Sequence, residues 1–247
     1  MKFGVIVRSI CERTEQLCFK SIKLAVPQKD VYVIRNAFPF SEAVRQMLIV
    51  AKKKRYDFFV SVDADTVLAP NWLRVIRKTL QEITDIDLYY KLDFQLQDRF
   101  VTNTLIYGLH LYNGKYIDKM LKILSKTRDS SKPEGNIRHK IDAKFTNVAS
   151  GHPIGYHGYE QYYREIYNRF AVRSFRNPED RRRYKLFKVN DEDNSVGWKG
   201  WIYGLKHKDT VLNLLDARNK ILSSEFGYKE KSKLEMELKE FYENAKR

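Results

Sequence analysis

The chain has 247 residues, 43% of them hydrophobic, which excludes a largely disordered polypeptide and fits one large α/β domain. Lysine and arginine outnumber aspartate and glutamate by 46 to 31, and the formal net charge of +15 favours polyanionic partners such as phosphorylated small molecules, anionic lipids or nucleic acid. The two cysteines, Cys11 and Cys18, make neither a disulfide framework nor a zinc site.

The sequence contains no obvious membrane or export signal. No stretch approaches the roughly 20 consecutive apolar residues that a membrane-spanning helix requires. Residues 1–10 hold a short apolar run without a cleavage-site pattern, so we expect a strand there rather than a signal peptide. These features predict a cytoplasmic protein, whose basic surface would allow peripheral contact with an anionic membrane.

The first hundred residues alternate between strand and helix patterns. Short apolar runs predict strands over residues 2–7, 31–34 and 58–62, the last of them apolar enough to be buried on both faces. Apolar residues at helical spacing predict helices from about Thr14, from Ser41 as N-cap, and from Pro70. This order predicts an α/β fold with a mostly parallel central sheet flanked by helices.

After residue 86 the pattern is less regular. We expect a strand over residues 104–112, helices over 116–124 and 159–173, and a charged helix over 229–247. The polar stretch from 127 to 140 is expected to be a mobile loop.

Polar side chains follow the first three predicted strands. Arg8 and Ser9 follow the first strand, Asn36 the second, and Asp63-Ala64-Asp65 the third. Ligands of open α/β sheets bind beyond the carboxyl ends of the strands, so these residues are candidates for a ligand site.

Asp63 and Asp65 have the chemistry of a metal site. Residues two apart in an extended chain point the same way, so both carboxylates could address one point. Two hard oxygen donors suit Mg²⁺ or Mn²⁺, which typically bridge carboxylates to substrate phosphates. The alternative is a pair of turn aspartates that merely follow a strand.

These residues carry a family resemblance. The run from Phe59 to Thr66, FVSVDADT, followed by Pro70-Asn71-Trp72-Leu73, resembles the metal-binding segment of GT-A-fold glycosyltransferases, in which a buried strand ends in D-x-D and a proline-led helix follows. Val7-Arg8-Ser9 and Glu12-Arg13-Thr14 resemble the first loop of the inverting, family-two-like members. The resemblance covers residues 1–112 and is weak beyond them.

The resemblance implies a fold, a donor and roles for single residues. It implies the GT-A (nucleotide-diphospho-sugar transferase) fold, a nucleotide-diphosphate sugar as donor, and Mn²⁺ or Mg²⁺ as cofactor. Asp65 would ligate the metal directly, and Asp63 would contact the ribose or the metal. Arg8, Asn36 and Arg45 would lie near the base, ribose or diphosphate. Residues 1–112 would form the nucleotide-sugar-binding half of the domain, residues 113–227 an elaborated acceptor-binding half, and residues 228–247 a C-terminal helix.

A second cluster of polar residues lies where a glycine loop leads into the helix expected over 159–173, which carries Glu160 in its first turn. Glu160 loosely resembles the base of inverting GT-A enzymes and could remove the proton of an acceptor hydroxyl, on a carbohydrate or another molecule. The alternative is a glutamate that complements the helix N-terminus. His157, or else His152, could be a third metal ligand, although a loop histidine is commonly surface; His207 is a weaker candidate.

Other functions fit part of the sequence. The run from Asp63 to Leu68, DADTVL, also fits the first motif of haloacid dehalogenase phosphatases, with Asp63 as nucleophile and Asp65 as acid/base, but that motif normally sits on the first strand. A non-catalytic nucleic-acid-binding protein fits the charge, yet no recognition motif appears, so we expect no nucleic-acid partner. A metal-dependent nucleotidyltransferase is a further alternative.

Overall fold

An eight-stranded sheet forms the centre of the protein in the computed structural model, which describes residues 1–37, 39–101, 105–127, 133–159, 161–176, 184 and 191–208. The strand order is β2-β1-β3-β6-β5-β8-β4, and β7 pairs with β5 beside β8. The strands are β1 (Phe3–Ser9), β2 (Val31–Arg35), β3 (Phe58–Asp63), β4 (Thr66–Leu68), β5 (Tyr89–Asp98), β6 (Leu105–Asn113), β7 (Lys144–Val148) and β8 (Gly155–His157).

Most described strands run in one direction. β2 and β3 are parallel to β1, and β6 is antiparallel to both β3 and β5, so β5 runs with β3. β7 and β8 are parallel to β5, and β4 is antiparallel to β8. Six of the eight described strands therefore share one direction, which confirms the predicted α/β class with a mostly parallel central sheet flanked by helices.

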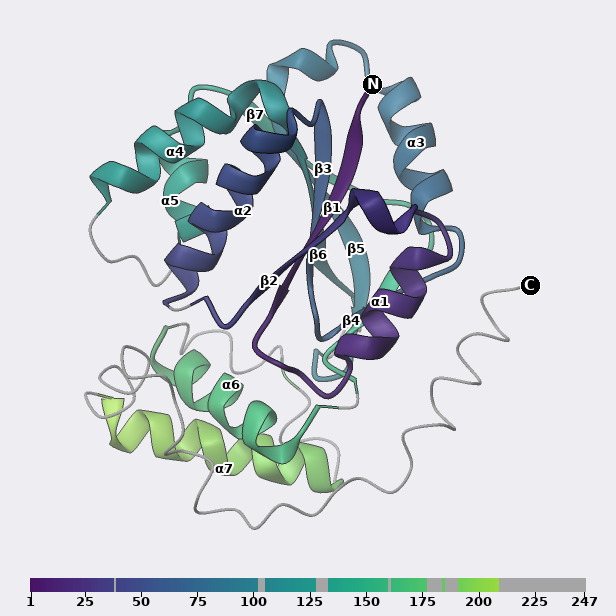
Figure 1. The fold of residues 1–247 in the computed structure, drawn as a ribbon. Coiled ribbons are helices and arrows are strands. Elements are labelled where there is room, and N and C mark those ends of the chain that lie inside the picture. Colours follow the sequence, from purple (N-terminus) through teal and green to yellow (C-terminus); the bar gives the residue numbers. More distant parts are fainter. Residues whose placement is uncertain are drawn as a thin grey trace.

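Helices cover both faces and one end of this sheet (Figure 1). The helices are α1 (Glu15–Lys23), α2 (Phe40–Lys54), α3 (Trp72–Glu82), α4 (Ile117–Lys126), α5 (Pro133–Lys140), α6 (Tyr163–Arg176) and α7 (Glu192–Lys206). Helices α1 and α3 pack on one face, and α2, α4 and α5 on the other. Helices α6 and α7 lie together beyond the end at which β1 and β3 finish.

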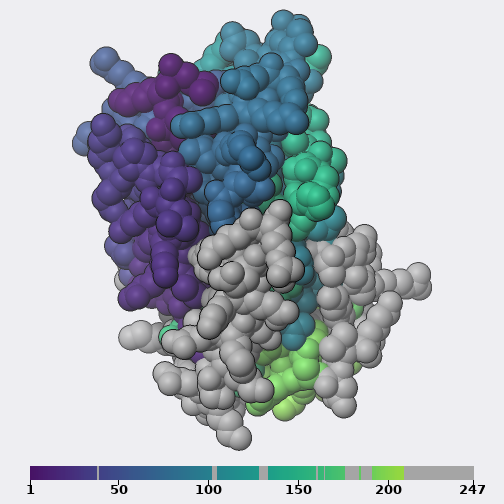
Figure 2. Space-filling view, turned by 90° about the vertical axis from the view of Figure 1, so that its right-hand side faces the viewer, coloured from purple at the N-terminus to yellow at the C-terminus, as the bar shows by residue number. Residues whose placement is uncertain are grey.

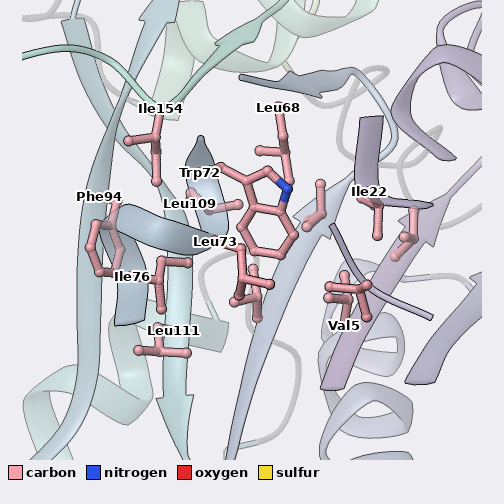
Figure 3. Packing of buried hydrophobic residues seen from close by; sticks show 14 of the residues in the cluster. Val5, Ile22, Leu68, Trp72, Leu73, Ile76, Phe94, Leu109, Leu111 and Ile154 are labelled. Atoms are coloured by element: carbon pink, nitrogen blue, oxygen red, sulfur yellow. The ribbon is translucent and has the colours of Figure 1, made fainter. Parts of the chain in front are cut away.

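Each face of the sheet has its own apolar core. Strand β3 is buried on both faces, as its mostly apolar run predicts. On the face of α1 and α3, Trp72 packs among Leu68, Leu73 and Ile76 (Figure 3). Full burial of a leucine or isoleucine side chain stabilises the folded state by about 1.5–3 kcal/mol. Figure 2 views the molecule from this side, with the first hundred residues above and α7 visible at the lower end.

A third apolar cluster joins α6 to α7. A Cβ added at Gly200 would lie 2.3 Å from the carbonyl oxygen of Tyr167, and one added at Gly204 would lie 2.0 Å from that of Ala171. The two helix backbones are therefore in direct contact. The cluster comprises Phe100, Val101, Ile166, Tyr167, Phe170, Tyr184, Val196 and Trp201.

Several sequence expectations need correction. Ser41 is not the N-cap of α2, because the helix begins at Phe40 and Pro39 holds the cap position. The expected loop over 127–140 contains helix α5, which buries Ile137. Helix α7 was not predicted; the Asp191 side chain caps it by accepting a hydrogen bond from the Asn194 amide.

Other expectations stay predictions. One of them is the division into a nucleotide-sugar-binding half and an acceptor-binding half at residue 112. Strands β7 and β8, which follow residue 112, belong to the same sheet as the earlier strands. The expected helix over 229–247 lies outside the described residues. Among the helices that the structure describes, none is both long and apolar enough to cross a bilayer.

We expect Gly204→Ala to destabilise the protein even though alanine is the better helix former by about 1 kcal/mol. The new methyl group would meet the backbone oxygen of Ala171, and such overpacking costs about 1–3 kcal/mol. Urea unfolding measures the change, and Lys206→Ala at an exposed position of the same helix is the control. A Gly204→Ala protein more stable than wild type would contradict the close packing.

Candidate active site

Strands β1, β3, β5 and β8 run in one direction, so their carboxyl ends lie at the same edge of the sheet, which faces α6 in Figure 1. They bring together Arg8, Asp63, Asp98 and His157. The pairing register explains why these residues meet, because Arg8 lies opposite Asp63 and His157 lies opposite both Asp98 and Thr66. This edge is where an open α/β sheet binds its ligands.

The two aspartates of the D-x-D run have different surroundings. Strand β3 ends at Asp63, and Ala64 and Asp65 form a turn before β4 begins. The expectation of an extended backbone through Asp65 is therefore wrong, and the two carboxylates have different partners. The turn is held because Ala64 donates its amide to the Arg8 carbonyl at 3.0 Å and accepts from the Thr14 hydroxyl at 2.8 Å.

Asp63, whose side chain is partly exposed, pairs with a buried arginine. The guanidinium of Arg8, which is 5% exposed, donates to Asp63 at 2.8 Å and to Glu134 of α5 at 3.0 Å. The ring of Phe40 stacks on this guanidinium, with 4.8 Å between the guanidinium carbon and the ring centroid. Tyr112 donates its hydroxyl to the same Glu134 oxygen at 2.9 Å. Arg8 therefore holds Asp63 and anchors α5; its contact with a nucleotide stays a prediction.

Glu134 is ionised by its neighbours. Burial alone would raise its pKa, but the positive charges of Arg8, His110 and Lys91 and the hydrogen bond from Tyr112 outweigh burial and lower the pKa to about 2. The sequence predicts a loop over residues 127–140, so it gives no sign that Glu134 lies in a helix beside Arg8.

Asp65 faces a histidine and an amide. Its Oδ2 atom lies 3.3 Å from Nε2 of His157 and accepts a hydrogen bond from the Gln161 side chain at 2.9 Å. Its Oδ1 atom is buried and has no hydrogen-bond partner within the described part of the chain. A buried carboxylate oxygen without a partner is costly, so this atom is a candidate ligand of a cation.

His157 is held from behind by Asp98. The Nδ1 atom of His157 lies 2.7 Å from Oδ2 of Asp98, and Arg169 of α6 donates to the same oxygen at 2.7 Å. The other oxygen of Asp98 accepts from the amides of Phe100 and Val101 at 2.8 and 3.1 Å. Burial would raise the pKa of Asp98, but Arg169 and His157 hold it well below its usual range.

A further carboxyl group, that of Glu12, lies near Asp65. Burial, and then the charge of Asp65, raise the pKa of Glu12 to about 7, although Glu12 accepts hydrogen bonds from Ile10 and Ser9. The acidic groups around this edge contrast with a formal net charge of +15 for the chain. Binding of a cation there would favour the ionised forms of Glu12 and Asp65.

The residues present fit a divalent cation in part. Within the described ranges, no group of three or more His, Cys, Asp and Glu side chains could by itself hold a metal ion. Asp65 and His157 offer a carboxylate and an imidazole, a donor pair that suits Mn²⁺, and the unpartnered Oδ1 of Asp65 is free to ligate. Substrate phosphates and water would have to complete the coordination.

The other predicted site residues that the structure describes are exposed. Asn36 is exposed after β2 with a positive φ of 52°, and Arg45 is exposed on α2, where it pairs with Glu42 at 2.6 Å. Glu160 lies outside the described residues, so its role stays a prediction. His152 and His207 are exposed.

Sequence analysis missed Asp98, Gln161, Arg169 and Glu134. The glycine at position 158, directly after His157, was a weak sequence signal of a close approach at this point, and its φ is +75°. A Cβ at Gly158 would lie 2.4 Å from Nη1 of Arg169, so a glycine is required where Arg169 crosses the chain.

A cavity of about 700 Å³ lies elsewhere, between α3 and the end of β7. It is lined by Arg74, Lys78, Thr146 and Ser150 among others, and not by Asp65, Asp98 or His157. It is therefore separate from the candidate site.

No protein-family model matches the sequence, and the curated proteins give no match. Among solved structures, a glycosyltransferase involved in the glycosylation of the major capsid of PBCV-1 is 7% identical with a TM-score of 0.48, covering 64% of this chain and 93% of that chain. A cytidylyltransferase from Leptospira borgpetersenii serovar Hardjo-bovis is 11% identical with a TM-score of 0.42, covering 89% and 98%.

A third structure, glucosyl-3-phosphoglycerate synthase from Mycobacterium tuberculosis in complex with Mn²⁺, uridine diphosphate and phosphoglyceric acid, is 12% identical with a TM-score of 0.37, covering 63% of this chain and 70% of that chain. These similarities concern the mixed α/β fold alone.

We expect Glu134→Gln to lower the melting temperature most above pH 4.5. The folded protein holds the pKa of Glu134 at about 2, below its ordinary value of 4.5, so its ionised form stabilises the fold by on the order of 3 kcal/mol. This contribution is present above pH 4.5 and is lost as the pH falls from 4.5 to about 2.

Melting temperatures of wild type and variant across this pH range provide the measurement. Glu82→Gln, which alters an exposed pair with Lys78, is the control and should change little at any pH. A wild-type advantage that grew as the pH fell would contradict the ionised assignment of Glu134.

Proposed function

We propose that the protein is a metal-dependent glycosyltransferase that moves a sugar from a nucleotide-diphosphate sugar to an acceptor hydroxyl. The observation that carries the proposal is the distance of 3.3 Å between Oδ2 of Asp65 and Nε2 of His157. Asp98 accepts the Nδ1 proton of His157, which leaves Nε2 as the ring nitrogen that would bind a cation beside the Asp65 carboxylate.

The surroundings support a phosphate-bearing ligand. The site lies at the carboxyl ends of parallel strands, and the net charge of +15 attracts an anionic donor over long range. Asp65 and His157 would hold Mn²⁺ or Mg²⁺, with Asp63 contacting the ribose or the metal. Arg8, Asn36 and Arg45 would lie near the nucleotide. When bound, the cation acts as a Lewis acid toward the diphosphate.

Glu160 is the proposed base. The acceptor oxygen would attack the anomeric carbon while the bond from that carbon to the diphosphate oxygen breaks, and Glu160 would take the acceptor proton. Attack from the face opposite the leaving group inverts the anomeric configuration. The Tyr162 amide donates to Glu165 at 2.8 Å, so a neighbouring glutamate already complements the start of α6. This contact leaves Glu160 unneeded for that task.

We expect Mn²⁺-dependent stabilisation by at least one of UDP-, GDP- or dTDP-sugars in a thermal-shift screen. A ligand at a hundred times its Kd should stabilise the fold by about 2.7 kcal/mol. Asp65→Asn should abolish this stabilisation, whereas Asp118→Asn, an exposed position on α4, should retain it. If no nucleotide sugar stabilised the wild-type protein in a metal-dependent way, the proposal would fail.

The reaction product separates the alternatives. Glycosyl transfer releases a nucleoside diphosphate, nucleotidyl transfer releases pyrophosphate, and a phosphatase releases phosphate from simple phosphomonoesters. Release of pyrophosphate or phosphate instead of a nucleoside diphosphate would reassign the site.

We expect Glu160→Gln to lower kcat roughly 10²–10⁴-fold, because the acceptor proton loses its base. Metal-dependent stabilisation by the donor should be unchanged, since the donor does not need this proton acceptor. Glu165→Gln, a carboxylate in the first turn of α6, is the matched control and should affect stability more than kcat. An unchanged kcat in Glu160→Gln would remove Glu160 from the mechanism.

A further inference from the structure

The Asp98 carboxylate is the most completely bonded side chain near the candidate site. It is 0% exposed and accepts from His157, Arg169 and the amides of Phe100 and Val101. The two amides fix one oxygen against the backbone, and the two side chains share the other. An ionised carboxylate can only accept hydrogen bonds, so each atom that contacts it at this distance must carry a hydrogen.

The consequence falls on His157. Its Nδ1 atom must bear the proton that Asp98 accepts, so Nε2 is the nitrogen left for a ligand. Nε2 is also the atom that lies 3.3 Å from Asp65. The hydrogen bond from Nδ1 to Asp98 therefore determines that Nε2 is the nitrogen that faces Asp65.

We infer that Asp98, held by Arg169, is a positioning residue that fixes the tautomer and orientation of His157, so that His157 Nε2 and Asp65 face one divalent cation. This inference rests on the proposed function, which supplies the cation. Carboxylates behind metal-ligating histidines typically contribute 10–100-fold to metal affinity.

Arg169 ties this arrangement to α6. Its guanidinium passes over Gly158, where a side chain would collide with it, and reaches Asp98 between β5 and β8. Its Nη1 atom also donates to the side-chain oxygen Oε1 of Gln161 at 3.5 Å, and the Nε2 atom of Gln161 donates to Asp65. The same arginine therefore connects both groups that contact Asp65.

The chain contains a matched control on the same strand. Asp93 of β5 also contacts a histidine, His110, at 2.6 Å, and a cation, Lys91, at 3.0 Å. Both Asp93 and Asp98 are buried. The two histidines differ in the group that their Nε2 atoms face. Nε2 of His110 lies 3.9 Å from Glu134, whereas Nε2 of His157 lies 3.3 Å from Asp65.

The experiment measures Mn²⁺ affinity of the full chain from the electron paramagnetic resonance signal of free Mn²⁺. Wild type, Asp65→Asn, Asp98→Asn and Asp93→Asn are compared. The amide of the Asp98→Asn side chain can offer an N–H group to Nδ1, which favours the tautomer with the proton on Nε2. We expect Asp98→Asn to weaken Mn²⁺ binding roughly 10–100-fold and Asp93→Asn to leave it unchanged.

The outcomes separate the two proposals. The titration is repeated with UDP, GDP or dTDP present, and if wild type binds no Mn²⁺ under any of these conditions, both the metal-dependent function and the positioning role fall. If Asp65→Asn loses binding but Asp98→Asn keeps wild-type affinity, the positioning role is wrong and the proposed function stands. Equal weakening in Asp98→Asn and Asp93→Asn would show a general loss of buried structure and would also overturn the positioning role.

A spectroscopic readout covers the case in which Asp98→Asn does not fold. The chain has five histidines, so ¹⁵N imidazole shifts of the metal-free wild type can be assigned with His157→Gln. We expect a protonated Nδ1 on His157. An unprotonated Nδ1 would overturn the inference without any variant at Asp98.

Discussion

The buried carboxylate of Asp98 is the contact on which the arrangement of the site depends. Its four hydrogen-bond donors come from the backbone after β5, from β8 and from α6. An ionised carboxylate away from water is very costly unless it is paired, so each of these segments must reach it in the folded state. One buried charge therefore fixes the segment after β5, strand β8 and the first half of α6 relative to one another.

The position of α6 in turn depends on packing away from the sheet. Gly200 and Gly204 let the backbone of α7 touch that of α6, and Trp201 fills the cluster between them. The low helix propensity of glycine is the cost of this contact. A segment that makes no contact with Asp65 thereby controls where Arg169 lies, which links a purely apolar cluster to the electrostatics of the site.

The sequence predicted the first half of the fold well because its signals are local. The apolar run of β3 and the aspartates after it can be read without knowing any partner. Asp98 and Arg169 are 71 positions apart, and their pairing exists only because β8 aligns with the end of β5. Helix α5 has Pro133 and Ile137 as its buried residues, too few for a helical period, so Glu134 was placed in a loop.

Two similar sets on β5 show where the protein is complete and where it is not. In the first, Asp93 contacts His110, and the Glu134 oxygen Oε1 is satisfied by Arg8 and Tyr112. In the second, Asp98 contacts His157, but within the described chain Oδ1 of Asp65 has no partner. The Oδ1 atom of Asp65 is therefore where the proposed cation would bind, because a buried carboxylate oxygen is costly to leave unpaired and the neighbouring network of described residues offers it no donor.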